Sequence, residues 1–273
     1  MVRAAVIQMV SSADVDDNLV QAGELLAEAA EDGARLAVLP ENFPFMGMHE
    51  QDKVALRETD GDGPIQAFLE ETARKHRMWI VGGTIPLEAD SPDHVRAASL
   101  LYDDQGRRMA RYDKIHLFDV EIDGDERYCE SDSLEAGGEI VVVETPIARI
   151  GLSVCYDVRF PELYRNMHHR GVELITVPSA FTATTGRAHW EVLLRARAVE
   201  NLCYVIAPNQ GGTHANGRET WGHSMIIDPW GQVLADVDYG AGFACADLDF
   251  EQLGQLRQRF PALSHRRLDY STK

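Results

Sequence analysis

Short apolar runs, separated by polar segments, recur along the whole chain. Each run is six to eight residues long and rich in Val, Ile, Leu and Ala, and runs of this kind are typical of β-strands. We therefore predict strands at residues 4–9, 35–40, 78–85, 97–102, 139–144, 148–155, 173–180, 203–209, 223–229 and 242–249.

Helical patterns lie between several of these runs. Leu19, Leu26 and Ala30 recur at helical spacing, and Pro64 and Pro161 stand where proline is favoured, at the first turn of a helix. The predicted helices cover residues 16–31, 64–76, 160–171 and 187–202.

Two polar segments, DDQG at 103–106 and DPWG at 228–231, separate neighbouring strand candidates and predict hairpin turns. Together with the alternation of strands and helices in the first half, they predict an α/β protein with some antiparallel pairing. Because no low-complexity linker or internal repeat interrupts the 273 residues, we expect a single domain over residues 1–273.

The charge of the chain limits its partners. Lys and Arg number 26 against 44 Asp and Glu, and the formal net charge of −18 repels a nucleic-acid backbone. The sequence has no run of 18 uncharged apolar residues, and its first residues enter an apolar run without a charged leader. We expect no nucleic-acid or membrane partner, and a protein of the cytoplasm.

The cysteines and histidines do not form a metal-binding pattern. Cys129, Cys155, Cys203 and Cys245 are 26, 48 and 42 residues apart, unlike a Cys-x-x-Cys site or a dense disulfide framework. The ten histidines include no His-Glu-x-x-His pair. We predict a reducing compartment, and neither a metal nor another cofactor.

Two polar side chains stand where predicted strands end. Glu41 follows the run 35–40, and Cys155 ends the run 148–155. Ligands of open α/β sheets bind beyond the carboxyl ends of the strands, so both residues are candidates for a site. A cysteine attacks a carbonyl as the thiolate, and its ordinary pKa of about 8.5 calls for a neighbouring base or positive field. Glu41 is a candidate for that base.

A tetrahedral intermediate also needs hydrogen-bond donors at its oxyanion. Lys114, in RYDKIHLFD, and the backbone N–H of Tyr156, directly after Cys155, are candidates. Taken singly, each side chain has an ordinary explanation: a cysteine after a strand usually packs in the core, Glu41 fits a turn and Lys114 fits a solvated surface. The prediction of an enzyme rests on their occurring together.

Together and in this order, the motifs LPENF, RYDKIHLFD and GLSVCYDVRFPELYR resemble the nitrilase superfamily of carbon-nitrogen hydrolases. The resemblance runs from AAVIQM to SHRRLDY and implies a four-layer αββα fold. It further implies that Glu41 is the general base and acid, that Lys114 stabilises the transition state, and that Cys155 is the acylated nucleophile.

A second carboxylate of that family, which positions the lysine, matches Glu130 in RYCES. Its neighbours Glu121, Asp125 and Glu126 are expected to be solvated charges. The runs FTATTGRAHWEVLLRARAVEN and WGHSMIIDPWG complete the pattern of the Nit-type amidase branch. Protomers of that branch pair through helices beside the active site, which implies a homodimer or a higher homo-oligomer.

Members of this branch act on small-molecule amides of 2-oxo dicarboxylic acids. The resemblance assigns the substrate carboxylate to Arg159 and the pocket walls to Phe181 and Thr185. From the residues alone, an ion pair of Arg159 with Glu162 or Asp157 is an equal alternative.

Two groups within the branch compete. Deaminated-glutathione amidases release 2-oxoglutarate and cysteinylglycine, whereas omega-amidases release ammonia from 2-oxoglutaramate. The segment APNQGGTHANGRETWGHS resembles the first group, and His214 and Arg218 would form a cationic pair for the dipeptide carboxylate. Alternatively, both are exposed loop residues.

Two interpretations of a different class also stay open. One is a catalytically silent nitrilase-like scaffold that binds another protein, which the complete set of candidate groups disfavours. The other is a peptidase or acyltransferase with a cysteine-histidine pair, in which His116 or His189 would orient the thiol. The sequence around Cys155 lacks a peptidase signature.

Overall fold

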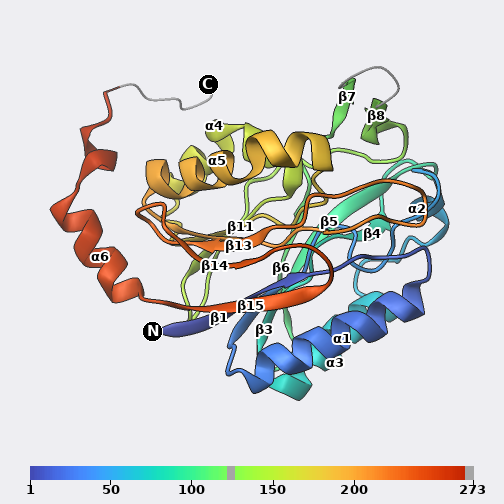
Figure 1. Ribbon diagram of the computed structural model, residues 1–273, viewed down its shortest axis with the longest axis horizontal. Coiled ribbons are helices and arrows are strands. Elements are labelled where there is room, and N and C mark those ends of the chain that lie inside the picture. Colours follow the sequence, from blue (N-terminus) through green and yellow to red (C-terminus); the bar gives the residue numbers. More distant parts are fainter. Residues whose placement is uncertain (122–126, 268–273) are drawn as a thin grey trace.

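Two β-sheets lie face to face in the computed structural model, which describes residues 1–121 and 127–267, and helices cover the outer face of each sheet (Figure 1). The predicted four-layer αββα sandwich is confirmed. Asp125, Glu126 and residues 268–270 of the SHRRLDY motif lie outside the described residues.

The first sheet has the strand order β15-β1-β2-β3-β5-β4, with β6 paired to β5. Strands β1, β2 and β3 run parallel to one another, and the remaining pairs are antiparallel. The strands are β1 (Val2–Gln8), β2 (Leu36–Val38), β3 (Trp79–Val81), β4 (Ile85–Glu88), β5 (Val95–Tyr102), β6 (Arg108–Asp113) and β15 (Gly242–Leu248).

The second sheet has the order β14-β13-β12-β11-β10-β9, and β10, β11 and β12 are parallel. A separate antiparallel ribbon of β7 and β8 projects from one end of the sandwich (Figure 1). These strands are β7 (Asp119–Glu121), β8 (Arg127–Cys129), β9 (Val142–Glu144), β10 (Arg149–Leu152), β11 (Leu174–Thr176), β12 (Tyr204–Ala207), β13 (Ser224–Ile227) and β14 (Val233–Val237).

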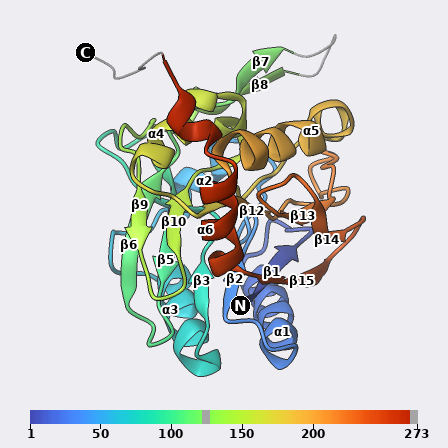
Figure 2. The same cartoon turned by 90° about the vertical axis from the view of Figure 1, so that its left-hand side faces the viewer.

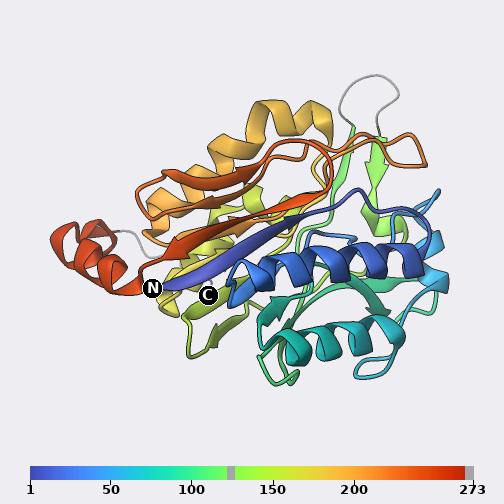
Figure 3. The ribbon, with the colours of Figure 1, turned by 60° about the horizontal axis from the view of Figure 1, so that its bottom comes forward.

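Helices α1 (Val15–Glu31) and α3 (Pro64–His76) lie side by side on the outer face of the first sheet (Figure 3). Helices α4 (Pro161–His169) and α5 (Ala183–Asn201) cover the second sheet. The short α2 (Asp52–Ala55) and the helix α6 (Phe250–Arg259) lie at opposite ends of the sandwich (Figures 1 and 2). Short 3-10 helices cover Glu130–Asp132, Cys155–Arg159 and Ala262–His265.

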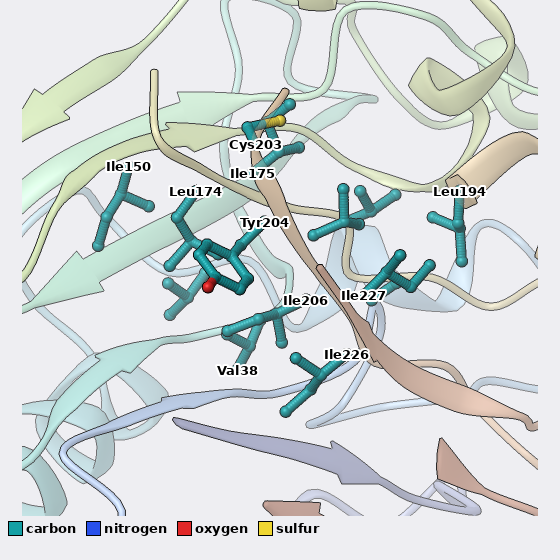
Figure 4. Close-up of a cluster of buried hydrophobic side chains, with 14 of the residues drawn as sticks. Val38, Ile150, Leu174, Ile175, Leu194, Cys203, Tyr204, Ile206, Ile226 and Ile227 are labelled. Atoms are coloured by element: carbon teal, nitrogen blue, oxygen red, sulfur yellow. The ribbon is translucent and has the colours of Figure 1, made fainter. Parts of the chain in front are cut away.

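Alternation along the strands divides the core into layers. In β1, Ala4 and Val6 pack between the two sheets, whereas Ala5 and Ile7 pack under the helices α1 and α3. Figure 4 shows the layer between the sheets, where Val38 of the first sheet lies in one cluster with Ile150 and Ile206 of the second. The first sheet is therefore buried on both faces, which explains why its parallel strands read as continuous apolar runs.

The predicted elements are confirmed in place, with corrections at their ends. Helix α3 has the predicted bounds, but α5 begins at Ala183 rather than 187, because Thr182 caps it by accepting a hydrogen bond from the backbone N–H of Thr185. The run 78–85 is divided between β3 and β4, because Gly83 has a φ of 44° and turns the chain. The run 148–155 forms strand only to Leu152.

Both predicted turns join antiparallel neighbours. The segment 103–106 connects β5 to β6, and 228–231 connects β13 to β14. The strands β6 and β14 themselves were not predicted, because they are partly exposed and mix apolar with charged residues. The helices α2 and α6 were not predicted either, and each buries little of its surface.

Candidate active site

The carboxyl ends of parallel strands from both sheets meet at one place. Glu41 follows β2 of the first sheet, while Cys155 and Ala180 follow β10 and β11 of the second. Lys114 directly follows β6, and Glu130 directly follows β8. Residues far apart in the sequence are thereby brought to one pocket, as expected for strand ends in α/β sheets.

The backbone at Cys155 adopts an unusual conformation. Its φ is 45°, in the left-handed region, which costs a residue with a side chain about 1–2 kcal/mol. The Cys155 N–H donates to the Pro178 carbonyl oxygen at 2.9 Å, and the Asp157 carboxylate accepts from the Val154 N–H at 2.8 Å. The turn that carries the thiol is thus held from both sides, which lets the surroundings impose the strained conformation.

Lys114 lies between two carboxylates. Its Nζ donates to Glu41 Oε1 at 2.8 Å and to Glu130 Oε1 and Oε2 at 2.9 and 2.8 Å. The Lys114 and Glu41 side chains are only 1% and 4% exposed, against 16% for Glu130. A buried charge needs such partners, because its desolvation is otherwise expensive.

Backbone donors hold the two carboxylates. Glu41 Oε2 accepts from the Ala180 N–H at 2.9 Å, and Glu130 Oε2 accepts from the Phe118 N–H at 2.8 Å. The Tyr156 N–H lies at the start of a 3-10 helix, where backbone donors have no acceptor within the helix. Because Tyr156 directly follows Cys155, this N–H is adjacent to the thiol in the chain.

Burial and charge set the protonation of the site. Burial raises the pKa of the Cys155 thiol well above its ordinary value, and the Glu41 carboxylate raises it further. Burial opposes charge on Lys114 and Glu41 as well, but each stabilises the other. Glu130 and Glu41 raise the pKa of Lys114 well above its ordinary value, and Lys114 holds that of Glu41 below its own. The resting site therefore has a neutral thiol beside a charged carboxylate and ammonium.

One narrow pocket gathers most of the predicted residues. It is lined by Glu41, Phe118, Glu130, Cys155, Tyr156, Arg159, Ala180, Phe181, Thr182, Thr185 and Arg218. Lys114 lies beneath this surface, bonded to two of the lining carboxylates. Sequence reasoning missed Phe118, Ala180 and Thr182; the position of PSAF at the end of the run 173–180 is the signal that points to the last two.

Arg159 does not make the internal ion pair considered from the sequence. Its guanidinium lies 5.3 Å from the ring centroid of Phe181 and 5.7 Å from that of Tyr156, and its Nη1 is 3.2 Å from His189 Nδ1. In the described part of the chain, no carboxylate pairs with it, and Asp157 instead accepts from Tyr112 Oη at 2.7 Å. Arg159 thus lines the pocket with a positive charge that no carboxylate of residues 1–121 or 127–267 compensates.

His214 departs from its expected position. Its side chain is buried outside the pocket lining, 2.9 Å from the Ser11 carbonyl oxygen and 2.8 Å from Thr220 Oγ1. Burial lowers its pKa below the ordinary value, so it does not form a cationic pair with Arg218. Arg218 does line the pocket, where its Nη2 donates to the Ala180 carbonyl oxygen at 2.6 Å.

The histidines proposed for a peptidase contact other groups. His116 Nδ1 lies 2.6 Å from Asp157 Oδ1, and its ring stacks on Phe160 at 3.7 Å between centroids. Among the residues with described positions, no histidine bonds to the Cys155 thiol, and burial, together with the nearby carboxylate of Glu41, raises the pKa of that thiol. The ionisable neighbour of Cys155 in the pocket is thus a carboxylate, not an imidazole.

Comparison with known proteins agrees with this geometry. The family model for carbon-nitrogen hydrolases matches residues 3–258. The chain belongs to the carbon-nitrogen hydrolase family. The predicted resemblance to the nitrilase superfamily is thereby confirmed, and this hydrolase is an enzyme that acts on carbon-nitrogen bonds.

Named relatives cover nearly all of this carbon-nitrogen hydrolase. A Synechocystis protein named deaminated glutathione amidase is 43% identical over 96% of the chain and 97% of its own length. The Caenorhabditis elegans NitFhit fusion protein is 42% identical, and the chain spans 61% of its length. Its crystal structure superposes with a TM-score of 0.92 over 99% of the chain and 66% of that structure. Saccharomyces cerevisiae Nit3, a member of branch 10 of the nitrilase superfamily, is 29% identical, with a TM-score of 0.88 over 98% of the chain and 97% of its own.

Residues 1–121 and 127–267 contain no group of three or more His, Cys, Asp or Glu side chains placed to hold a metal ion. Within the same ranges, no helix combines the length and the apolar character needed to cross a membrane.

Proposed function

We propose that this enzyme is an amidase that hydrolyses deaminated glutathione to 2-oxoglutarate and cysteinylglycine through a cysteine thioester. The observation that carries the proposal is a single pocket in which Cys155 faces the buried Glu41, Lys114 and Glu130 cluster and Arg159 offers an unpaired charge. Relatives bearing the amidase name, 40–43% identical over nearly the whole chain, support the choice of substrate.

Glu41 starts the reaction as the base. With the thiol neutral, the site carries one positive and two negative side chains. A thiolate formed without proton transfer to a neighbour would add a further negative charge. Transfer of the thiol proton to Glu41 as sulfur attacks the amide carbon leaves the net charge of the site unchanged, because the new negative charge resides on the amide oxygen.

Lys114 and the Tyr156 N–H bind that oxygen. Because the ammonium is fixed between two carboxylates before substrate arrives, it needs little reorganisation when the oxyanion forms. Glu41 then gives its proton to the nitrogen as the carbon-nitrogen bond breaks. In the second half, Glu41 takes a proton from water, the hydroxide attacks the thioester, and the proton returns to the Cys155 sulfur as the acid leaves.

The acyl half of the substrate is bound by Arg159, Phe181 and Thr185. The planar guanidinium suits the carboxylate of a 2-oxo dicarboxylic acid, because it offers two parallel N–H donors. The guanidinium lies over the ring face of Phe181, where a cation is attracted by the aromatic ring. Thr185, at the first turn of α5, contributes the polar wall of the pocket.

The acyl half is common to deaminated glutathione and 2-oxoglutaramate, so this pocket alone does not separate them. The deciding experiment is an assay of 2-oxoglutarate release from each amide by the purified protein, with Cys155→Ala and Cys245→Ala variants. Cys245 is a thiol on β15, outside the pocket, so its loss is expected to leave turnover unchanged.

Faster release from deaminated glutathione, lost only in Cys155→Ala, would support the proposal. Preference for 2-oxoglutaramate would make the enzyme an omega-amidase. If neither amide is turned over in a Cys155-dependent way, the proposal is wrong and the silent scaffold gains support.

We also propose that the chain acts as one domain over residues 1–273, in the cytoplasm, as a homodimer or higher homo-oligomer. Val192 and Val199 of α5 are 62% and 48% exposed, which supports pairing through this helix. Sedimentation of the wild type and a Val192→Glu variant tests the pairing: a dissociated variant beside an associated wild type is expected. A monomeric wild type would refute it.

A further inference from the structure

A second hollow adjoins the catalytic pocket. This outer pocket, of about 480 Å³, is lined by Asn42, residues 45–50, Lys53, 127–129 and 216–218. Small-molecule sites commonly measure roughly 300–1,000 Å³. Its walls come from the segment around α2, from β8 and from a loop between β12 and β13, which lie at the same end of the sandwich (Figures 1 and 3).

The two pockets share a wall. Arg218 lines both of them. Residues that are neighbours in the sequence also line different pockets. Glu41 and Glu130 line the catalytic pocket, whereas Asn42 and Cys129, next to them, line the outer pocket. The outer pocket therefore begins where the lining of the catalytic pocket ends.

Basic side chains dominate the outer pocket, although the chain as a whole carries a net charge of −18. Among the residues that the structure describes, Lys53, Arg127 and Arg218 line it, against the single carboxylate of Glu50. Lys53 Nζ lies 2.6 Å from Glu50 Oε2, and an ammonium retains further donors after one such bond. Arg127 is an exposed residue at the start of β8. This local surplus of positive charge suits an anionic group.

Arg218 adds a donor at the boundary. Its guanidinium lies 5.1 Å from the ring centroid of Tyr128, and its Nε is buried without a hydrogen-bond partner in the described part of the molecule. A buried donor without a partner calls for an explanation, and a bound ligand is one. The lining also includes Phe45, Met46 and Met48, whose apolar and sulfur-bearing side chains suit an uncharged thiol side chain.

We propose that the outer pocket binds the amine half of the substrate, a peptide-like group with a terminal carboxylate, and that Lys53 and Arg127 bind this carboxylate. The inference rests on the proposed function. The acyl half stays against Arg159 as the thioester while the amine, protonated by Glu41, departs through the outer pocket. An amide that releases only ammonia leaves the outer pocket unused.

The test compares the wild type with the double variant Lys53→Gln, Arg127→Gln on three substrates. These are deaminated glutathione, its analogue with the terminal carboxylate converted to an amide, and 2-oxoglutaramate. Arg35→Gln, which removes an exposed cation outside both pockets, is the matched control.

For deaminated glutathione we expect the double variant to lose about ten- to hundredfold in kcat/KM, mainly through KM, the range for a lost charge-assisted hydrogen bond. The wild type should lose a similar factor on the amidated analogue, and the double variant should lose no more than about twofold further. Turnover of 2-oxoglutaramate should be unchanged in both.

Equal losses on all three substrates, or an amidation penalty that persists in the double variant, would overturn the subsite. If the wild type hydrolyses 2-oxoglutaramate but not deaminated glutathione, the proposed substrate fails and the subsite fails with it. An active wild type without the expected discrimination overturns the subsite alone.

Discussion

Replacing Glu130 by Gln tests whether Lys114 must be held by two carboxylates. The change keeps the size of the side chain and one acceptor oxygen. It removes the negative charge of the carboxylate, whose two oxygens accept hydrogen bonds from Lys114 at 2.8 and 2.9 Å. Among the described residues, Lys114 then keeps only Glu41 as an anionic partner, at 2.8 Å, so it is drawn towards the proposed base and away from the oxyanion. Catalysis should suffer more than folding.

The expected decrease in kcat and the expected loss of folding stability can each be given a magnitude. Loss of one oxyanion donor typically reduces kcat by about 10²–10³, and we expect a decrease of this size. Breaking a buried ion pair costs about 3–5 kcal/mol, but Gln retains an acceptor, so we expect about 1–3 kcal/mol. For a chain of this size, that corresponds to a Tm lower by roughly 2–4 °C per kcal/mol.

The assay is steady-state release of 2-oxoglutarate, with melting followed on the same preparations. Asp132→Asn removes the same charge from an exposed position of the same 3-10 helix and serves as the control. A Glu130→Gln variant whose kcat stays within about threefold of wild type, while its Tm falls, would show that Glu130 stabilises the fold only. An equal loss of kcat in both variants would show that the overall negative charge of this segment matters, and not the contact of Glu130 with Lys114.

Three further predictions concern substrate binding, folding and pH. Arg159→Lys keeps the charge but not the paired donors, so KM for the 2-oxo acid amides should rise about tenfold with little change in kcat; a lower kcat at constant KM would contradict this. Asp157→Asn disturbs a buried carboxylate that accepts from Val154, Tyr112 and His116, and urea titration should give a loss of about 3 kcal/mol or more, whereas less than about 1 kcal/mol would exclude an anchoring role. Burial lowers the pKa of His168 from 6.5 to about 4. As the pH drops, the unfolded chain therefore binds a proton at His168 before the folded protein does, and the free energy of unfolding should fall between about pH 6.5 and about pH 4. His168→Phe should flatten this part of the Tm profile, and an unchanged slope would refute the assignment.

The sequence could predict the parts of the site that depend on local pattern. Glu41 and Cys155 follow apolar runs that do form strands, so their positions at strand ends are readable. Lys114 and Glu130 follow β6 and β8, partly exposed strands without a clear apolar pattern, so the role of Lys114 and the choice of Glu130 rested on the family resemblance. Local periodicity carries no information about partners that meet through the fold.

His214 illustrates the same limit. Its imidazole is buried against the Ser11 carbonyl, 203 positions earlier in the chain. A histidine in a Gly-rich loop looks exposed until that distant contact is known. The strained φ of Cys155 is equally hidden, because it follows from the contacts of Pro178 and Asp157 with the turn rather than from the residue type.

The proposed base and nucleophile follow strands of different sheets, so substitutions in the core between the sheets can change the rate of the reaction. Glu41 is carried by β2 and Cys155 by β10, so the distance between them is fixed by how Val38 and Ile150 pack in the layer of Figure 4. A displacement of about 1 Å at reacting atoms can reduce a rate about a hundredfold. Substitutions at the centre of this layer that leave the fold intact should therefore still be removed by selection on turnover, and drift should concentrate in the layers beneath α1 and α3.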